Sequence, residues 1–153
     1  MALEMERSAR SPAYQAYLLL RIGFVGAPIL FGLDKFFNFM VRWPDYLAPW
    51  IANLAHVVSL SPQQFMYIVG VIEIVAGVVV FVTPRYGSLL VALWLAGIII
   101  NLLTGRPPEY YDIALRDFGL FLAALSLNRL ATAIGVTTIR SELARSRRPQ
   151  LAG

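Results

Sequence analysis

Four separate apolar runs constrain the fold of this chain more than any other feature of its sequence. They cover residues 17–40, 64–82, 86–103 and 113–131, and a helix needs about 20 mostly apolar residues to cross the hydrocarbon core of a bilayer. Only 14% of the 153 residues are charged, against roughly 25% in soluble domains. The sequence therefore predicts an all-α integral membrane four-helix bundle over residues 14–132, with almost no chain left for a separate soluble domain.

The positive charges indicate how the bundle is oriented. If the four spans alternate, most basic residues fall on the side of the two termini, and fewer fall on the other side, namely Lys35, Arg42, Arg106 and Arg116. Because cytoplasmic loops carry an excess of Lys and Arg, we expect both termini in the cytoplasm. The net charge of +4 follows from this topology and requires no nucleic-acid partner.

The ends of the chain are predicted to be tails. The first span follows Arg7 and Arg10, as in a secretory signal, but no small-residue cleavage site follows it, so we expect a retained helix after a cytoplasmic tail of residues 1–13. Residues 133–153 are predicted to form a basic cytoplasmic tail. Within it, we expect residues 140–153 to be disordered and attracted to anionic lipid.

A short amphipathic helix is predicted between the first two spans, from Pro44 to Pro62. Apolar residues recur there at helical spacing, but the segment is too short to span and should lie in the membrane interface. The only histidine of the chain, His56, lies in this segment and is expected to face the headgroups. A single histidine and the absence of cysteine exclude bis-histidine haem ligation within one chain, thiolate catalysis and thiolate metal sites, and we predict no metal site.

Polar side chains inside the apolar runs are the candidate site residues. They are Arg21, Asp34, Lys35, Glu73, Asn101, Arg116 and Asp117. A charge deep in a bilayer costs at least about 2.5 to 3.5 kcal/mol, so these groups should face one another inside the bundle. The expected pairs are Asp34 or Asp117 with Arg116, Lys35 with Asp117, and Arg21 with Glu73, which lies nearest the midplane.

Small residues lie on the same helix faces as these polar groups. Gly70 and Gly77 share the face of Glu73, and Gly97 shares the face of Asn101. Small residues allow close approach of membrane helices. They equally leave room for a flat ligand, and this second reading predicts a slot lined by the three glycines and Trp94.

Four stretches of the sequence resemble the DoxX/DoxD family of small four-span bacterial membrane proteins. They are "LLLRIGFVGAPILFGLDKFFN", "VGVIEIVAGVVV", "YGSLLVALWLAGIIINLL" and "YDIALRDFGLFLAALSLNRLA", and the resemblance covers roughly residues 17–131. It implies a four-helix bundle in the bacterial cytoplasmic membrane, with possible site roles at Arg21, Asp34, Lys35, Glu73, Arg116 and Asp117. One branch of the family is the membrane part of a thiosulfate:quinone oxidoreductase. This chain lacks the cysteine that a persulfide or disulfide mechanism would use.

The leading hypothesis is a membrane subunit of an oxidoreductase or respiratory assembly that holds a quinone or similar lipid. Arg116 and Asn101 would donate hydrogen bonds to the quinone, and Glu73 or Asp34 would exchange protons. Asp117, Lys35 and Arg21 complete the expected ligand-binding set. The expected partners are membrane lipid and either redox or membrane subunits or a second copy of this chain.

Two alternatives remain open from the sequence. The chain could be a structural anchor or assembly subunit without chemistry of its own, or a small transporter or proton pathway that uses the charges from Arg21 through Glu73 to Asp34. The sequence does not decide whether the chain is itself an enzyme.

Overall fold

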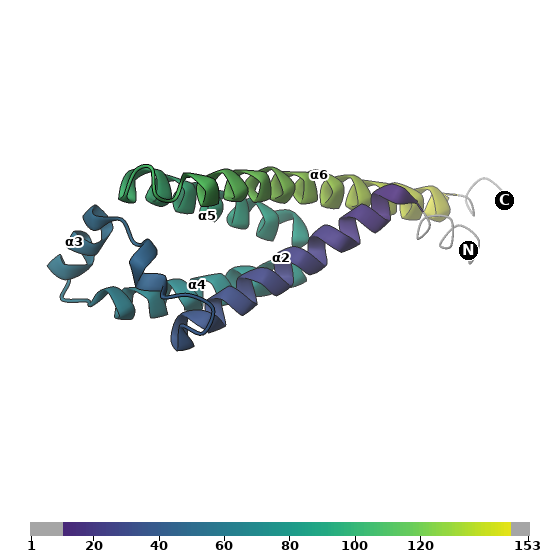
Figure 1. Cartoon of the computed structure of the whole chain (residues 1–153). Helices are drawn as coiled ribbons and strands as arrows, with labels where there is room; N and C mark the ends of the chain where they lie inside the picture. Colours follow the sequence, from purple (N-terminus) through teal and green to yellow (C-terminus); the bar gives the residue numbers. More distant parts are fainter. Residues whose placement is uncertain (1–10, 148–153) are drawn as a thin grey trace.

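The protein is an all-α bundle of four long helices, as predicted (Figure 1). The computed structural model describes residues 11–147, with side chains over residues 11–135. The elements are α2 (Pro12–Phe37), the 3₁₀ helix η1 (Trp43–Tyr46), α3 (Pro49–Val57), α4 (Pro62–Val82), α5 (Pro84–Gly105) and α6 (Tyr111–Arg147). Four segments are long and apolar enough to cross a membrane: α2, α4, α5 and residues Tyr111–Gly135 of α6. The chain is therefore a multi-pass membrane protein.

The first helix lies earlier in the sequence than predicted. It begins at Pro12 because the Ser11 side chain accepts a hydrogen bond from the Tyr14 N–H and proline suits the first helical position. It ends at Phe37, because Asn38 adopts the left-handed conformation that closes many helices, with φ 51°.

The last helix runs well past the predicted end of its span. α6 continues to Arg147, so residues 132–147, part of which we expected to be disordered, are helical. The sequence after residue 131 has no proline before Pro149, and nothing else in it stops a helix. Residues 1–10 of the expected N-terminal tail and residues 148–153 of the C-terminal tail lie outside the described residues.

The four spans are organised as two helix pairs. α2 lies along α4, and α5 lies along α6, as Figure 1 shows. Between α2 and α4 the backbones nearly touch, since a Cβ on Gly70 would lie 2.6 Å from the Gly32 carbonyl oxygen. A Cβ on Gly77 would lie 2.9 Å from the Val25 carbonyl oxygen. The glycines therefore fix how α2 and α4 pack.

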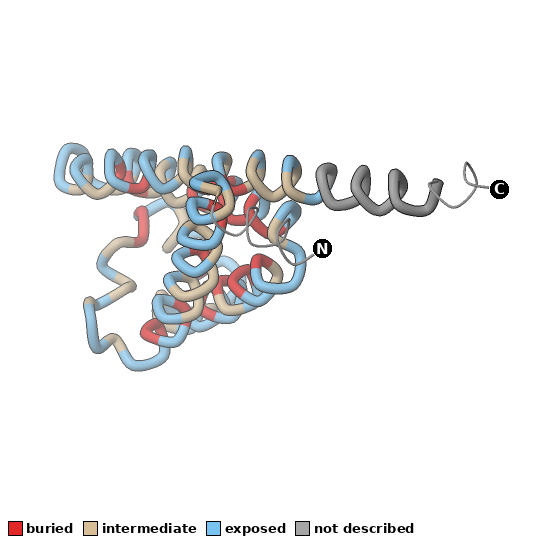
Figure 2. Tube along the Cα trace, turned by 90° about the vertical axis from the view of Figure 1, so that its right-hand side faces the viewer, coloured by how far each residue is buried: buried red, intermediate tan, exposed pale blue. Residues whose placement is uncertain are grey.

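The two pairs meet over an apolar core near the chain termini, here called the terminal end. All four spans contribute to it: Tyr17 and Phe24 from α2, Ala76 and Val80 from α4, Val91, Ala92 and Leu95 from α5, and Ala124 and Leu127 from α6. In Figure 2 the buried residues lie where the helices face one another, and the outward surfaces are largely exposed. Those surfaces carry large apolar side chains, as lipid-facing surfaces do.

The opposite end, here called the loop end, carries η1, α3 and residues 106–110. The short helix predicted between the first two spans is present as α3, preceded by η1. Hydrogen bonds hold this segment onto α5: Asn101 bonds the backbone on both sides of Leu47, and the Trp50 indole donates to the Thr104 hydroxyl at 2.9 Å. The loop end is thus joined by polar contacts. His56 is exposed in the last turn of α3.

Candidate functional site

A buried ion pair between α2 and α4 is the centre of the candidate site. The Lys35 Nζ lies 2.6 Å from the Glu73 Oε2, and their side chains are only 4% and 8% exposed. The close contact of Gly32 with Gly70 lets the pair form. The two helices run antiparallel, so Lys35 and Glu73 lie about one turn from this contact in opposite directions, and their long side chains bridge the distance. The sequence predicted both residues as site members but placed Lys35 opposite Asp117, and that pairing is wrong.

The relative register of the two helices places the Lys35 backbone nearer the loop end than the Glu73 backbone, and the long Lys35 side chain spans the difference. Gly32 precedes the last residue of α2 by five positions, about 7.5 Å, whereas Gly70 follows the first residue of α4 by eight positions, about 12 Å. Because Gly32 touches Gly70, α2 ends deeper in the bundle than α4 begins. The sequence gave no indication of this offset.

Two indole rings complete the surroundings of the pair. The Lys35 Nζ lies 3.6 Å from the centroid of the Trp43 ring, a cation–π contact. The Trp94 Nε1 donates to the Glu73 Oε1 at 3.4 Å. Glu73 therefore has one oxygen in a short contact with an ammonium group and a second oxygen in a long, weak hydrogen bond. Trp94 is half-buried, so the Glu73 Oε1 contacts a side chain that lies near the bundle surface.

Asp34 organises the end of its own helix. Its carboxylate accepts hydrogen bonds from the Phe39 and Met40 N–H groups at 3.0 and 3.1 Å and from the Trp43 Nε1 at 2.7 Å. It does not pair with Arg116, as one sequence prediction had it. Asp34 instead holds the Trp43 indole over Lys35, and through Trp43 it positions the ion pair.

Asn38 and Gln63 link the same turn to α4. The Asn38 Nδ2 donates to the Gln63 Oε1 at 2.9 Å, and the Gln63 Nε2 donates to the Lys35 carbonyl oxygen at 3.0 Å. Asn38, Gln63 and Trp43 were not among the site residues predicted from the sequence. The available signal was the polar pair Gln63 and Gln64 at the start of an otherwise apolar span.

Asn101 is engaged in structural hydrogen bonds. Its Oδ1 accepts from the Ala48 N–H, and its Nδ2 donates to the Tyr46 carbonyl oxygen, both at 2.8 Å. The predicted role as a hydrogen-bond donor to a quinone would have to use the second N–H of Nδ2, because the first is bonded to Tyr46. The geometry therefore gives Asn101 the task of holding the segment between α2 and α3 against α5.

Arg116 and Asp117 bond to each other and lie apart from the Lys35–Glu73 pair. The Arg116 Nη2 lies 3.1 Å from the Asp117 Oδ1, with side chains 67% and 8% exposed. Neighbouring helical residues point about 100° apart, so one of them faces outward when the other faces the bundle. Of the two partners predicted for Arg116, Asp117 is therefore paired with it and Asp34 is not.

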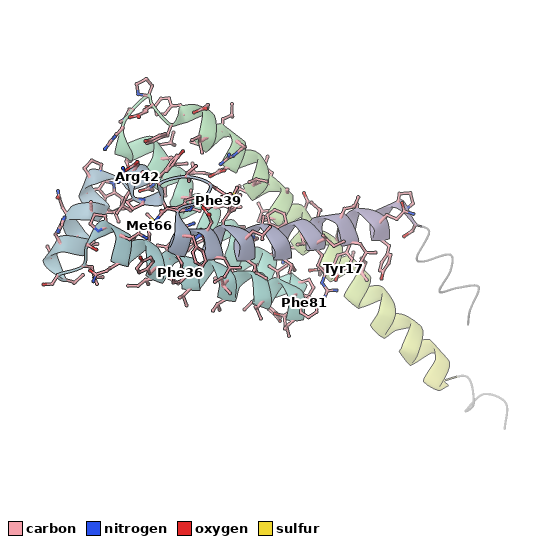
Figure 3. The ribbon with its side chains drawn as sticks, turned by 60° about the horizontal axis from the view of Figure 1, so that its bottom comes forward. Tyr17, Phe36, Phe39, Arg42, Met66 and Phe81 are labelled. Atoms are coloured by element: carbon pink, nitrogen blue, oxygen red, sulfur yellow. The ribbon has the colours of Figure 1, made fainter. Side chains whose placement is uncertain are left out.

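Arg21 belongs to the terminal end. Its guanidinium donates to the Phe81 carbonyl oxygen near the end of α4 and to the Tyr17 hydroxyl, and Figure 3 shows Tyr17 and Phe81 at that end. Arg21 precedes Lys35 by 14 positions, about 21 Å along α2. The predicted pairing of Arg21 with Glu73 is wrong, because the offset of α2 against α4 puts Lys35 there.

The slot predicted beside the three glycines is not formed as expected. Gly70 and Gly77 are covered by α2, whereas a Cβ on Gly97 would meet nothing within 4 Å. Of the four residues expected to line that slot, only Trp94 reaches Glu73. Among the described residues, no group of three or more His, Asp or Glu side chains is arranged to hold a metal ion.

Comparisons with known proteins add no relative to this picture, since no family model, curated protein or solved structure matches the chain.

Proposed function

We propose that this protein is a multi-pass subunit of an oxidoreductase or respiratory assembly that holds a quinone or similar lipid beside the Lys35–Glu73 pair. The membrane would be the bacterial cytoplasmic membrane, with both termini in the cytoplasm. The proposal depends on one observation, the buried contact of 2.6 Å between two ionisable groups in membrane-spanning helices. Apolar residues of similar volume often stabilise a fold as well as a buried ion pair does, and intramembrane charges usually mark function.

The chemistry of the pair suits a quinone headgroup. Such a headgroup needs hydrogen-bond donors for its carbonyl oxygens, a proton-exchanging group and apolar walls. The Lys35 ammonium is a donor, and the pair is flanked by the ring face of Trp43 at Lys35 and the indole N–H of Trp94 at Glu73. Among the described residues, the Glu73 Oε1 accepts only the bond of 3.4 Å from Trp94, so a quinol hydroxyl could replace Trp94 there and pass its proton to Glu73.

Electrons would have to pass to or from another subunit. The chain has no cysteine for an iron–sulfur cluster or a disulfide, and its single His56 lies on α3 at the bundle end. The resemblance of the sequence to the DoxX/DoxD family supports a redox assembly as the context. In this proposal the chain binds the quinone and moves protons, and a partner subunit supplies the redox centre.

Quinone extraction tests the proposal. The protein would be purified in mild detergent with any co-purifying subunits, and quinone would be extracted and measured by mass spectrometry. We expect about one quinone for each chain, and a loss of about tenfold in Glu73→Gln, the change that about 1.4 kcal/mol of binding free energy produces. Arg116→Gln is the matched control, because the exposed Arg116 side chain bonds to Asp117. Absence of quinone from the wild type, or equal amounts in Glu73→Gln, would reject the proposal.

A structural anchor is the second candidate, and a specific observation favours it. Asp34 and Asn101 form hydrogen bonds with the protein's own backbone, and Asp34 also bonds to Trp43. These two polar side chains of the spans therefore stabilise the fold. An anchor predicts that Glu73→Gln lowers the yield of a partner complex that contains no quinone. The proton-pathway alternative was based on a series of charges from Arg21 through Glu73 to Asp34. Arg21 is bonded at the terminal end instead, so this series is not formed.

A further inference from the structure

The chain turns back along the bundle after α2 instead of leaving it. Asn38 donates its N–H to the Asp34 carbonyl oxygen at 2.6 Å, and the following residues run back beside α2. The Trp43 ring then packs against Phe31, with ring centroids 5.9 Å apart. Phe31 precedes the last residue of α2 by six positions, about 9 Å along the helix.

The same segment also lies beside the last turn of α5. Its residues Tyr46 and Ala48 bond to Asn101, which precedes the last residue of α5 by four positions, about 6 Å along the helix. α2 itself ends deeper than α4 begins, as the contact of Gly32 with Gly70 requires. Figure 1 shows η1 on the side of α3 that faces the bundle. Residues 38–48 therefore lie alongside the ends of membrane-spanning helices and not beyond them.

Polar side chains of the spans satisfy the backbone of this segment. Irregular backbone at membrane depth is tolerated only where its N–H and C=O groups find partners in the protein. Asp34 accepts from the N–H groups of Phe39 and Met40, and Asn38 accepts from that of Trp43 at 3.1 Å. Asn101 accepts from the N–H of Ala48. These contacts explain why Asp34 and Asn101 occur inside apolar spans.

The exposed surface of the segment continues the lipid-facing surface of α2. Leu30, Leu33 and Phe37 follow one another at helical spacing and are exposed on α2. Phe39, which is 91% exposed, and Met40 extend this apolar surface past the helix end, and Figure 3 shows Phe39 near Arg42 at that end. Lipid that covers the exposed surface of α2 should therefore also cover Phe39 and Met40.

We propose that residues 38–48 form a shallow re-entrant segment in the leaflet at the loop end. The side chains of Phe39 and Met40 lie among the acyl chains, and the exposed side chains of Arg42 and Asp45 reach the headgroups. The partner of this surface is thus the lipid of that leaflet. The segment holds the Trp43 indole at the depth of Lys35.

Site-directed spin labelling tests the depth of the segment. The chain contains no cysteine, so Phe39→Cys provides one site for a nitroxide in vesicles of phosphatidylethanolamine and phosphatidylglycerol. Collisions with oxygen, which concentrates among acyl chains, are compared with collisions with a water-soluble nickel chelate. The matched controls are Leu93→Cys, on an exposed face of α5, and Glu109→Cys, in the exposed loop before α6.

We expect the label at position 39 to collide more with oxygen than with the nickel chelate, as the label at position 93 does. A signal like that of position 109 would overturn the proposal, because the segment would then lie in water. Shielding from both reagents would overturn it as well, because a protein partner would then cover Phe39. Met40→Cys gives an independent label should Phe39→Cys fail to fold, and adding Asp34→Ala should shift either label toward the nickel chelate. Loss of bound quinone alone would not move the label.

Discussion

The two ends of the bundle are held together in different ways. At the terminal end, four spans meet through apolar side chains such as Val80, Ala124 and Leu127, which are completely buried. At the loop end, polar contacts also join the elements: an ion pair and the hydrogen bonds of Asp34 and Asn101 lie there beside ring contacts such as that of Phe36 with Tyr67. Lipid is as apolar as leucine, so membrane helices associate through close packing and polar contacts more than through removal of apolar surface from water. The comparison predicts that single substitutions cost most where they leave a buried polar group without its partner.

The largest effect is expected at the buried ion pair. Lys35→Met or Glu73→Leu leaves a charge without its partner in surroundings where both side chains are under a tenth exposed. Each single change should lower the free energy of unfolding by about 3 to 5 kcal/mol, the cost of breaking a buried pair on one side. Reversible unfolding in mixed detergent and dodecyl sulfate, followed by circular dichroism, measures it.

The double variant Lys35→Met with Glu73→Leu provides the control for this prediction. It removes both charges, so it should recover most of the stability that either single change loses. A double variant as unstable as the sum of the single variants would show that the two charges act independently. The loss of stability in each single variant would then not come from leaving the other charge without its partner.

The next largest effect is expected where two backbones touch. Gly70→Ala places a Cβ 2.6 Å from the Gly32 carbonyl oxygen, and the resulting overpacking should cost about 1 to 3 kcal/mol. Gly97→Ala is the matched control, because its Cβ meets no atom within 4 Å and alanine favours a helix over glycine by about 1 kcal/mol. The same unfolding measurement applies, and equal stability of the two variants would contradict the prediction.

The amino-acid sequence predicted the spans far better than the contacts between them. Hydropathy and length locate a helix that must cross a membrane, so four spans and a short helix after the first were predicted correctly. Depth along a helix follows from counting residues, but the direction of a side chain and the offset between helices do not. Lys35 was therefore given the wrong partner, and Arg21 was expected at Glu73. The offset depends on Gly32, whose contact with Gly70 cannot be recognised until both helices are placed.

Asp34 shows a second limit of the sequence. A carboxylate inside an apolar run suggested a charge partner on another helix, but it bonds two N–H groups of the following turn and an indole nine positions later. Such contacts depend on a chain reversal that begins at Asn38, whose left-handed φ the sequence alone did not indicate. Polar residues near the end of a span can thus serve the backbone that follows it.

A moderate effect is expected when Asn101 is removed. Asn101→Leu leaves the Ala48 N–H and the Tyr46 carbonyl oxygen without their partner, and interhelical polar contacts in membranes average about 0.6 kcal/mol with a maximum of about 1.7. We expect a loss of about 1 kcal/mol, together with faster hydrogen exchange of the Ala48 amide. Thr104→Val removes the hydroxyl that accepts from the exposed Trp50 and donates to the Ile100 carbonyl oxygen of its own helix, and it should leave that amide protected. Unchanged exchange in Asn101→Leu would contradict the role assigned to Asn101.

The smallest effect is expected at the second ion pair of the loop end, between Arg42 and Asp45. The Arg42 Nε lies 3.9 Å from the Asp45 Oδ2, and the two side chains are 82% and 55% exposed. Water and headgroups solvate both charges, so Arg42→Ala should change the free energy of unfolding by less than about 0.5 kcal/mol. The Lys35–Glu73 and Arg42–Asp45 pairs both lie at the loop end, and they differ in burial and in contact distance. If Arg42→Ala lowers the free energy of unfolding as much as Lys35→Met does, the charges at this end act through the membrane surface. A much smaller decrease in Arg42→Ala locates the stabilising contribution in the buried contact of Lys35 with Glu73.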